Sequence, residues 1–309
     1  MFNDGEMTNR VLMSGASGML GSAIGKALTS RGLATLKLVR RQPSMDNELE
    51  WNPVEGGGIA RIEMLEGVSA AIHLSGANVA SRRWTSAFKR EMTASRVGST
   101  RVLAEALARL KRPPKVLIAA SATGIYGNRG DALLDENSPA GSGFFPELCT
   151  AWELAAKPAS DAGIRVVHLR LGVVIGAAGG LMGRMVPLFR LGLGGPLGDG
   201  RQWMSWISER DVVSAALMAL DDGKIQGVVN TVAPEPVTNA DFTRELARAV
   251  HRAAPIPAPA FALRLAFGEM ADEALLASTR VIPKRLIEAG FRFEYPTLPE
   301  AFRGALEGR

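Results

Sequence analysis

The chain has 309 residues, 47% of them hydrophobic and 22% charged, which is typical of a globular protein and excludes a disordered chain. The net charge of +5 is modest and the basic residues are scattered, so nucleic-acid binding is not expected, and no apolar run reaches the ~18 residues that span a membrane. The single cysteine, Cys149, excludes an intrachain disulfide, and the first ten residues carry no signal-peptide pattern, so we expect a cytoplasmic protein.

After a loose leader over residues 1–9, the segment 11–21 predicts a buried strand, a glycine turn and the start of a helix. Its three glycines lie three residues apart. The first allows a sharp turn out of the strand, the second lets a pyrophosphate approach the backbone, and the third lets the helix pack close to the strand. The alternative is a tight turn without a ligand. We assign cofactor contacts to the residues of this turn: Gly15, Ser17, Gly18, Met19, Leu20 and Gly21.

A second strand is predicted over 34–39, and it ends in Arg40 and Arg41. An NAD site usually has an acidic side chain at this position, which accepts hydrogen bonds from the ribose hydroxyls. Two guanidinium groups can instead pair with the 2′-phosphate of NADP, so we predict NADP(H) as the cofactor. The alternative is that both arginines belong to a solvated strand end.

The next buried strand is expected over 70–74, and it is followed by small residues that would let a cofactor lie across the sheet edge. His73 lies inside this strand and is expected to be a packed core residue. A long helix is predicted over 85–110. From these two segments we assign four further cofactor contacts: Leu74, Ser75, Gly76 and Arg96.

Strands over 115–120 and 164–169 continue the alternation of strands and helices, with a helix starting near Phe145 between them. This order predicts an α/β fold, a Rossmann-type doubly wound parallel sheet with helices on both faces. Ser121, Thr123 and Tyr126 follow the first of these strands, and we expect them beside the nicotinamide and the substrate.

The composition changes after residue 172. Ten glycines between 172 and 200 predict a mobile, loop-rich segment that shapes a substrate site, together with Arg170, Trp203, Ser205 and Trp206. A strand is expected over 202–207, a helix over 209–220, a strand over 227–232, and a helix over 239–250 that Thr238 caps with Asp241 as its partner. The predicted domains are an NADP-binding Rossmann domain over 9–172, with returning segments within 200–250, substrate-shaping segments over 173–254, and a small, mostly helical C-terminal domain over 255–309.

Taken together, the glycine spacing and the segments 73–76, 121–127 and 169–172 resemble the extended short-chain dehydrogenases/reductases. Further segments resemble an atypical subgroup, the NAD(P)-dependent epimerase-like proteins labelled nucleoside-diphosphate-sugar epimerases. The tail from Pro255 resembles the small, substrate-side C-terminal domain of that subgroup. The segments that carry this closer resemblance are Arg83-Trp84, 95–97, Trp152-Glu153, 194–198, 205–207 and 233–239.

The wider family uses a Ser, a Tyr and a Lys, with the Tyr and Lys four residues apart on one helix. Counting along the equivalent helix places Cys149 and Glu153 at those two positions, and Ala122 at the position of the Ser. A thiol is ordinarily more acidic than a phenol, so Cys149 could move a proton, the alternative being a small buried residue. Glu153 cannot reproduce the charge of lysine, but it could hold a ribose hydroxyl or act as an acid or base. The candidate catalytic residues are Ser121, Thr123, Tyr126, Cys149 and Glu153.

The resemblance implies an NADP(H)-binding protein of the epimerase or oxidoreductase type, which transfers a hydride to or from an unidentified small substrate. A nucleotide-sugar is one candidate substrate. The missing Tyr–Lys pair leaves an alternative, a non-catalytic NADP(H)-binding sensor or scaffold. We expect no metal site, no nucleic-acid or membrane partner, and a monomer or homodimer.

Overall fold

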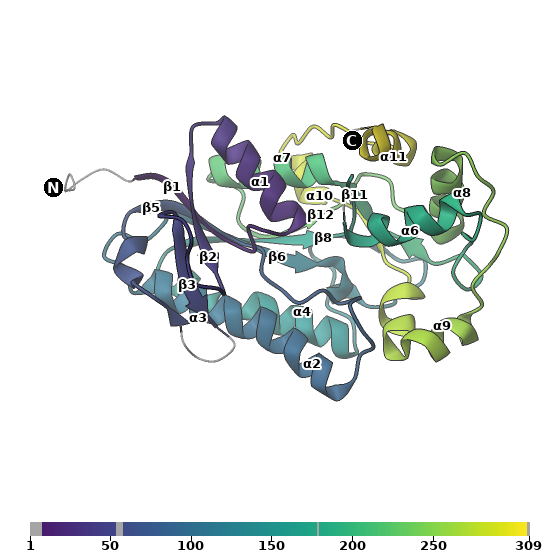
Figure 1. Ribbon diagram of the computed structural model, residues 1–309, viewed down its shortest axis with the longest axis horizontal. Helices are drawn as coiled ribbons and strands as arrows, with labels where there is room; N and C mark the ends of the chain where they lie inside the picture. The colour runs from purple at the N-terminus through teal and green to yellow at the C-terminus, as the bar shows by residue number, and fades with distance from the viewer. Residues whose placement is uncertain (1–7, 54–57, 178, 308–309) are drawn as a thin grey trace.

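An eight-stranded sheet with helices on both faces forms the centre of the molecule, and smaller elements from the second half of the chain gather at one end (Figure 1). The computed structural model describes residues 8–53, 58–177 and 179–307, so most of the expected leader lies outside the described residues. The strand order is β12-β8-β6-β5-β1-β2-β3-β4, and all pairs are parallel except β3 with β4. The predicted Rossmann-type α/β fold is therefore confirmed.

The elements of the sheet and its flanking helices follow in chain order. They are β1 (Thr8–Ser14), α1 (Met19–Ser30), β2 (Ala34–Val39), β3 (Glu48–Asn52), β4 (Gly58–Ile59), β5 (Val68–His73), α2 (Ser86–Thr93), α3 (Ser99–Ala108), β6 (Val116–Ala122), α4 (Phe144–Leu154), α5 (Lys157–Asp161), β8 (Arg165–Leu171), α7 (Glu209–Asp221) and β12 (Gly227–Thr231).

The smaller elements include short turns of 3₁₀- and π-helix. They are η1 (Ile62–Leu65), η2 (Ala94–Gly98), η3 (Thr123–Tyr126), β7 (Leu133–Leu134), β9 (Val173–Ile175), α6 (Gly180–Arg190), β10 (Trp203–Met204), β11 (Trp206–Ser208), β13 (Val237–Thr238), α8 (Asn239–Ala249), α9 (Ala260–Phe267), η4 (Ala271–Leu275), β14 (Arg280–Val281), α10 (Lys284–Glu288) and α11 (Leu298–Glu307).

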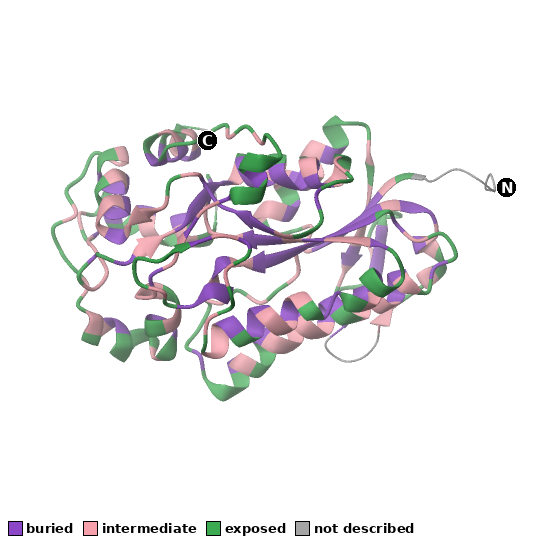
Figure 2. Ribbon diagram, turned by 180° about the vertical axis from the view of Figure 1, so that it is seen from behind, coloured by how far each residue is buried: buried purple, intermediate pink, exposed green. Residues whose placement is uncertain are grey.

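The central strands are apolar along their length because both faces of the sheet are covered. Val11 and Met13 of β1 pack on one face with α1 and α7, and Leu12 packs on the other face with α3 and α5. Figure 2 shows these strands buried, while the flanking helices alternate buried and exposed residues. Because successive side chains of β1 point to opposite faces of the sheet, this one strand contributes to both hydrophobic cores.

The part of the sheet around β2 is covered on one face only. Residues 40–47 connect β2 to β3 without a helix, so Thr35 and Lys37 line an open groove of about 450 Å³ beside α1. Leu36 and Leu38, which point to the other face, are buried in the core against α3. The alternation of polar and apolar residues in β2 thus matches one solvated and one buried face.

Two expectations about the later elements were wrong. The glycine-rich segment 172–200 contains α6, whose Met182, Val186 and Phe189 are buried in a core with α8 and α11. The strand expected over 202–207 is divided at Ser205, so that β10 pairs with β13 and β11 pairs with β9. The Ser205 hydroxyl donates to Thr279 O at 2.8 Å and accepts from Val281 N, which fixes the chain at the division.

Two expectations about individual helices were confirmed. The long helix over 85–110 runs as α2, the π-helical turn η2 and α3, with Ala94 and Gly98 both in right-handed helical conformation. Thr238 caps α8 by accepting from Asp241 N, although the Asp241 carboxylate accepts the Thr238 hydroxyl and not its backbone amide.

Among the described residues, no helix is both long and apolar enough to cross a bilayer. In the same part of the chain, no group of three or more His, Cys, Asp or Glu could hold a metal ion.

His73 is a fully buried core residue that ties three elements together. Its Nδ1 lies 2.6 Å from Ser14 Oγ in β1, and its Nε2 lies 3.2 Å from Ser99 Oγ in α3. Burial lowers the pKa of His73 from 6.5 to about 4. The imidazole is therefore neutral in the folded protein at neutral pH and links the strand before the glycine turn to the next layer.

We expect His73 to make folding sensitive to acid. Because the unfolded chain binds this proton more tightly, stability falls as the pH drops from 6.5 towards 4, by about 2 kcal/mol between pH 7 and pH 5. Urea unfolding at several pH values would measure this loss, and it should be smaller in His73→Asn, whose amide does not titrate. An equal loss in the variant would contradict the assignment.

Candidate active site

The turn after β1 brings three backbone segments so close together that side chains cannot fit. A Cβ on Gly15, which has φ +69°, would lie 2.8 Å from the carbonyl carbon of Leu74 at the end of β5. A Cβ on Gly21 would lie 2.1 Å from Gly15 O. A Cβ on Gly18 would meet only Gly15 O, at 3.3 Å, so the space beyond it is open. Gly15 and Gly21 therefore meet the steric constraints expected of the first and third glycines, and the open space at Gly18 is where a pyrophosphate would approach.

Among the described residues, no side chain caps the start of α1. Gly18 is the N-cap residue, and the first turn contains no acidic residue. The free amide groups and the positive end of the helix dipole therefore fit the pyrophosphate of a dinucleotide. Gly176 and Gly180 bring the chain after β9 against Met19 at this turn, a neighbour that the sequence did not predict.

The two arginines after β2 differ in their surroundings, although both are exposed. Arg41 makes a two-pronged ion pair with Glu48 at 2.6 and 2.9 Å, and Ser44 donates two further hydrogen bonds to the same carboxylate. Hydrogen bonds from Arg41 and Ser44 lower the pKa of Glu48 to about 2. The charge of Arg41 is thus neutralised and its position fixed, whereas no ion pair neutralises Arg40 among the described residues.

The loop after β5 rests on a buried cation. Arg96 is 8% exposed, donates to Ala77 O at 2.8 Å, and stacks on the Trp152 ring at 5.1 Å. A Cβ on Gly76 would lie 3.3 Å from Arg96 Cζ. Burial lowers the pKa of Arg96, and in the described part of the chain no carboxylate lies within ion-pair distance of it. Arg96 is therefore a buried positive charge below Gly76, at the same sheet edge as the glycine turn.

Ser121, Glu153 and Arg170 meet where β6 and β8 end. Ser121 and Arg170 are paired in the sheet register, and α4 brings Glu153 over them. Arg170 Nε and Nη2 each lie 2.8 Å from a Glu153 carboxylate oxygen, and Ser121 Oγ donates to Glu153 Oε1 at 2.6 Å. Burial alone would raise the pKa of Glu153, but the hydrogen bonds and charge of Arg170 outweigh it and hold the pKa below its ordinary value. Glu153 is therefore a carboxylate at neutral pH.

Tyr126 extends this network into the core. It is fully buried, its hydroxyl accepts from Arg170 Nη1 at 3.0 Å, and Asn230 Oδ1 lies 2.7 Å from that hydroxyl as its acceptor. Burial raises the pKa of Tyr126, against the effect of Arg170. Asn230 comes from β12, more than a hundred residues further along the chain, and no pattern in the sequence pointed to it.

The remaining two candidates lie beside this network. Thr123 Oγ1 donates to Leu171 O at 3.3 Å. Cys149 is fully buried with Ile125, Tyr126 and Val232, and burial raises the pKa of its thiol to about 12. The acidity of an ordinary thiol, on which its expected role in proton transfer depended, is therefore absent here.

Comparisons with known proteins agree with this geometry. Residues 11–231 match the model of the NAD dependent epimerase/dehydratase family, and residues 258–305 match a domain of unknown function, DUF1731. The chain is 47% identical over 296 residues to "Epimerase family protein Mb2239" of Mycobacterium bovis, which covers 96% of this chain and 97% of that protein. The chain therefore belongs to the NAD-dependent epimerase/dehydratase family, as the resemblance predicted.

Two solved structures are also similar. The crystal structure of human epimerase family protein SDR39U1 (isoform 2) with NADPH has a TM-score of 0.89 and 35% identity, and the match covers 97% of this chain and 100% of that chain. The nucleoside-diphosphate sugar epimerase from Corynebacterium glutamicum has a TM-score of 0.80 and 34% identity, over 96% of this chain and 58% of that chain.

We expect Arg40, which has no ion pair among the described residues, to set the preference for a phosphorylated cofactor, with Arg41 held beside it by Glu48. The double variant Arg40→Ala/Arg41→Ala should weaken NADPH binding by roughly tenfold to a hundredfold, because charged hydrogen bonds contribute about 1.5–3 kcal/mol, and should change NADH binding by less than about threefold. Isothermal titration calorimetry with both nucleotides measures this, with the exposed Arg109→Ala as control. Equal weakening of both nucleotides would remove the basis for the preference.

We also expect Arg170→Met to destabilise the protein by about 3 kcal/mol, since it leaves Glu153 charged and without its cation in the interior. Adding Glu153→Gln to this variant should recover part of the loss by removing the unpaired charge. Chemical unfolding of the two variants tests this. A double variant no more stable than Arg170→Met would show that the ion pair is not the source of the effect.

Proposed function

We propose that this chain is an NADP(H)-dependent oxidoreductase or epimerase, which transfers a hydride to or from a small substrate such as a nucleotide-sugar. The observation that carries the proposal is that Ser121, Glu153 and Arg170 lie at the same sheet edge as an uncapped glycine turn. The NADPH in the human structure supports the cofactor, and the name of the Corynebacterium protein supports the substrate class.

The residues present fit a bound dinucleotide. The first amides of α1 would hold the pyrophosphate, Arg40 and Arg41 the 2′-phosphate, and Arg96 with the Gly76 loop the part of the cofactor nearest β5. When bound, the nicotinamide supplies or accepts the hydride. The side chains of the protein carry out the proton transfer and hold the reacting groups in position.

Ser121 and Glu153 are the groups that we propose to move the proton. Ser121 Oγ donates a hydrogen bond to Glu153 Oε1. As a substrate hydroxyl is oxidised, Ser121 would take up the proton that this hydroxyl loses and pass its own proton to Glu153, which would thereby become the neutral acid. Arg170 keeps Glu153 charged and oriented through two hydrogen bonds, and Tyr126 with Asn230 orients Arg170. In this arrangement, Arg170 contributes a cation beside the position where the wider family has its lysine.

A second function remains, that of a non-catalytic NADP(H)-binding sensor or scaffold. It is favoured by the chemistry around Arg170, where the pKa of Cys149 is about 12, that of Tyr126 is raised, and that of Glu153 is lowered. None of these three groups changes its protonation near neutral pH. Such a protein would bind the cofactor tightly and show no turnover with any substrate.

The test is oxidation of NADPH by carbonyl compounds, followed by the absorbance of the reduced nicotinamide, and conversion of sugar nucleotides in the presence of NADP⁺. The sugar nucleotides are followed by chromatography, because epimerisation regenerates the cofactor. In the oxidation direction we expect a rate that is constant between roughly pH 5 and pH 9, because Glu153 titrates below this range and Tyr126 above it. Ser121→Ala and Glu153→Gln should each lower kcat by about a hundredfold or more, with NADPH affinity unchanged. The exposed Glu147→Gln, on the same helix, is the control.

Turnover by Ser121→Ala or Glu153→Gln at the rate of the control would contradict the proposed proton transfer. Cofactor binding without any turnover by the unmodified protein would instead favour the sensor or scaffold.

A further inference from the structure

The helix that carries Glu153 has its N-terminal cap in a distant part of the chain. The Glu273 carboxylate, in η4 of the C-terminal domain, accepts from Phe144 N at 3.0 Å and from Phe145 N at 2.7 Å. The N-cap residue of α4 itself is Gly143, which has no side chain that could cap the helix. Two of the amides that a helix start leaves unpaired are therefore bound by a carboxylate, the group that the positive end of the helix dipole favours.

Gly143 is shaped for this contact. Its φ of +114° lies outside the range that side chains readily adopt, and a Cβ would lie 2.7 Å from Glu273 Oε1. Residue 143 thus leaves room for the incoming carboxylate where a local N-cap residue such as Ser or Asp would otherwise stand. The loop before α4 and the C-terminal domain fit each other at this point.

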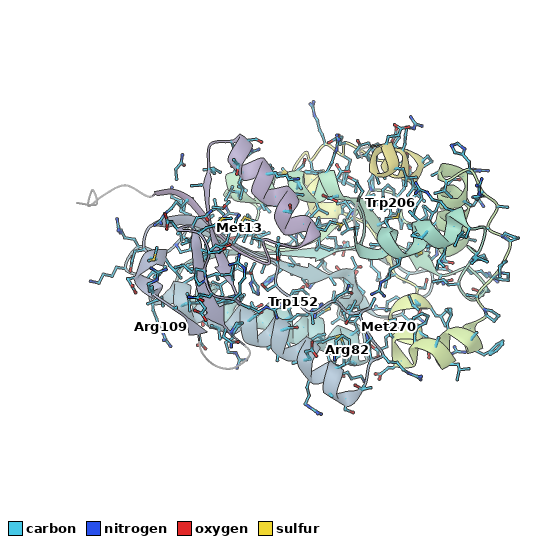
Figure 3. All side chains as sticks on the ribbon, viewed as in Figure 1. Met13, Arg82, Arg109, Trp152, Trp206 and Met270 are labelled. Atoms are coloured by element: carbon cyan, nitrogen blue, oxygen red, sulfur yellow. The ribbon has the colours of Figure 1, made fainter. Side chains whose placement is uncertain are left out.

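The segment around Glu273 is fixed to the same region by further contacts. Glu269 forms an ion pair with Lys89 of α2, and the Lys89 ammonium lies 4.6 Å from the centre of the Phe144 ring. Met270 is buried with Trp84 of the loop before α2 and with Leu148 of α4. Figure 3 labels Met270 at this end of α2, together with Arg82, whose guanidinium lies over the Phe88 ring.

The first turn of α4 is in contact with the site residues after β6. A Cβ on Gly124 would lie 2.4 Å from the Phe145 ring, and a Cβ on Gly127 would lie 3.2 Å from Pro146. Gly124 lies inside η3, the turn that contains Thr123 and Tyr126, and Gly127 directly follows that turn. The far end of the same helix carries Trp152 and Glu153, so one rigid element connects the cap to the Arg170 ion pair.

We propose that Glu273 is a positioning residue, and that a role of the C-terminal domain is to cap α4 and so hold Glu153 against Arg170 and Ser121. The catalytic consequence rests on the function proposed above. The cap and its effect on the Glu153–Arg170 ion pair can be measured without turnover.

The experiment compares Glu273→Gln with Glu269→Gln. The two residues lie four positions apart, and each variant exchanges a carboxylate for an amide of the same size, but only Glu273 accepts from the amides of α4. Hydrogen exchange in the peptides covering 144–148 should be about fivefold to tenfold faster in Glu273→Gln, and within twofold of the unmodified protein in Glu269→Gln. Gly143→Ala, which crowds the same carboxylate from the other side, should reproduce the effect of Glu273→Gln.

The effect of the cap on the position of Glu153 is measured through the pKa of Glu153. A carboxyl ¹³C NMR titration should show the pKa of Glu153 moving up towards its ordinary value in Glu273→Gln, because the ion pair with Arg170 is held less firmly, and unchanged in Glu269→Gln. If the protein turns over substrate, kcat should fall by about tenfold in Glu273→Gln while the NADPH dissociation constant stays within twofold, since the glycine turn is not involved.

Equal hydrogen-exchange rates over residues 144–148 in Glu273→Gln and Glu269→Gln would contradict the proposed cap. Faster exchange with an unchanged Glu153 titration would overturn the positioning role and leave Glu273 a purely structural cap. Absence of turnover in the unmodified protein would count against the proposed function only, because exchange and titration still decide this inference.

Discussion

The buried ion pair between Arg170 and Glu153 is the interaction on which the site depends. Two charges that are largely out of water are stable only with each other and with their remaining hydrogen bonds satisfied. Ser121 and Tyr126 supply those bonds, and the pair thereby joins β6, β8, α4 and η3 at one point. The identity of residue 153 follows from this arrangement, because a lysine there would meet the Arg170 cation directly, whereas a carboxylate complements it.

The sequence predicted the parts of the site that are local in the chain. Gly15, Gly18 and Gly21 lie within seven residues, and the steric reasons that make them glycine act within the turn or on the neighbouring strand end. The alternation of strands and helices predicted the parallel sheet, because short βα units have few ways to fold. Helix α6 was missed since Gly179, Gly180 and Gly183 mask its apolar face, although Met182, Val186 and Phe189 have helical spacing.

The parts that the sequence could not predict depend on contacts between distant residues. Asn230 meets Tyr126 across 104 positions, and Glu273 meets Phe144 across 129. A single sequence gives the type of each residue but not its partner, so Glu273 reads only as an acidic residue in a helical tail. Cys149 shows the same limit for acidity, because the ordinary pKa of a thiol applies in water and burial raises it to about 12.

The charges along the sheet edge link the C-terminal domain to the part of the chain that would bind the cofactor. At the β2 end, Glu48 neutralises Arg41, and at the β8 end Glu153 neutralises Arg170, so each cation is fixed by a carboxylate from another element. Glu273 uses the same device at the α4 end, where the positive group is the start of a helix instead of a side chain. Gly143 has space for that carboxylate and no cap of its own, so α4 without Glu273 would begin with unpaired amides beside Gly124. The start of the helix that carries Glu153 is therefore capped by the domain of unknown function. The orientation of Glu153 then depends on residues 258–305 as well as on residues 11–231.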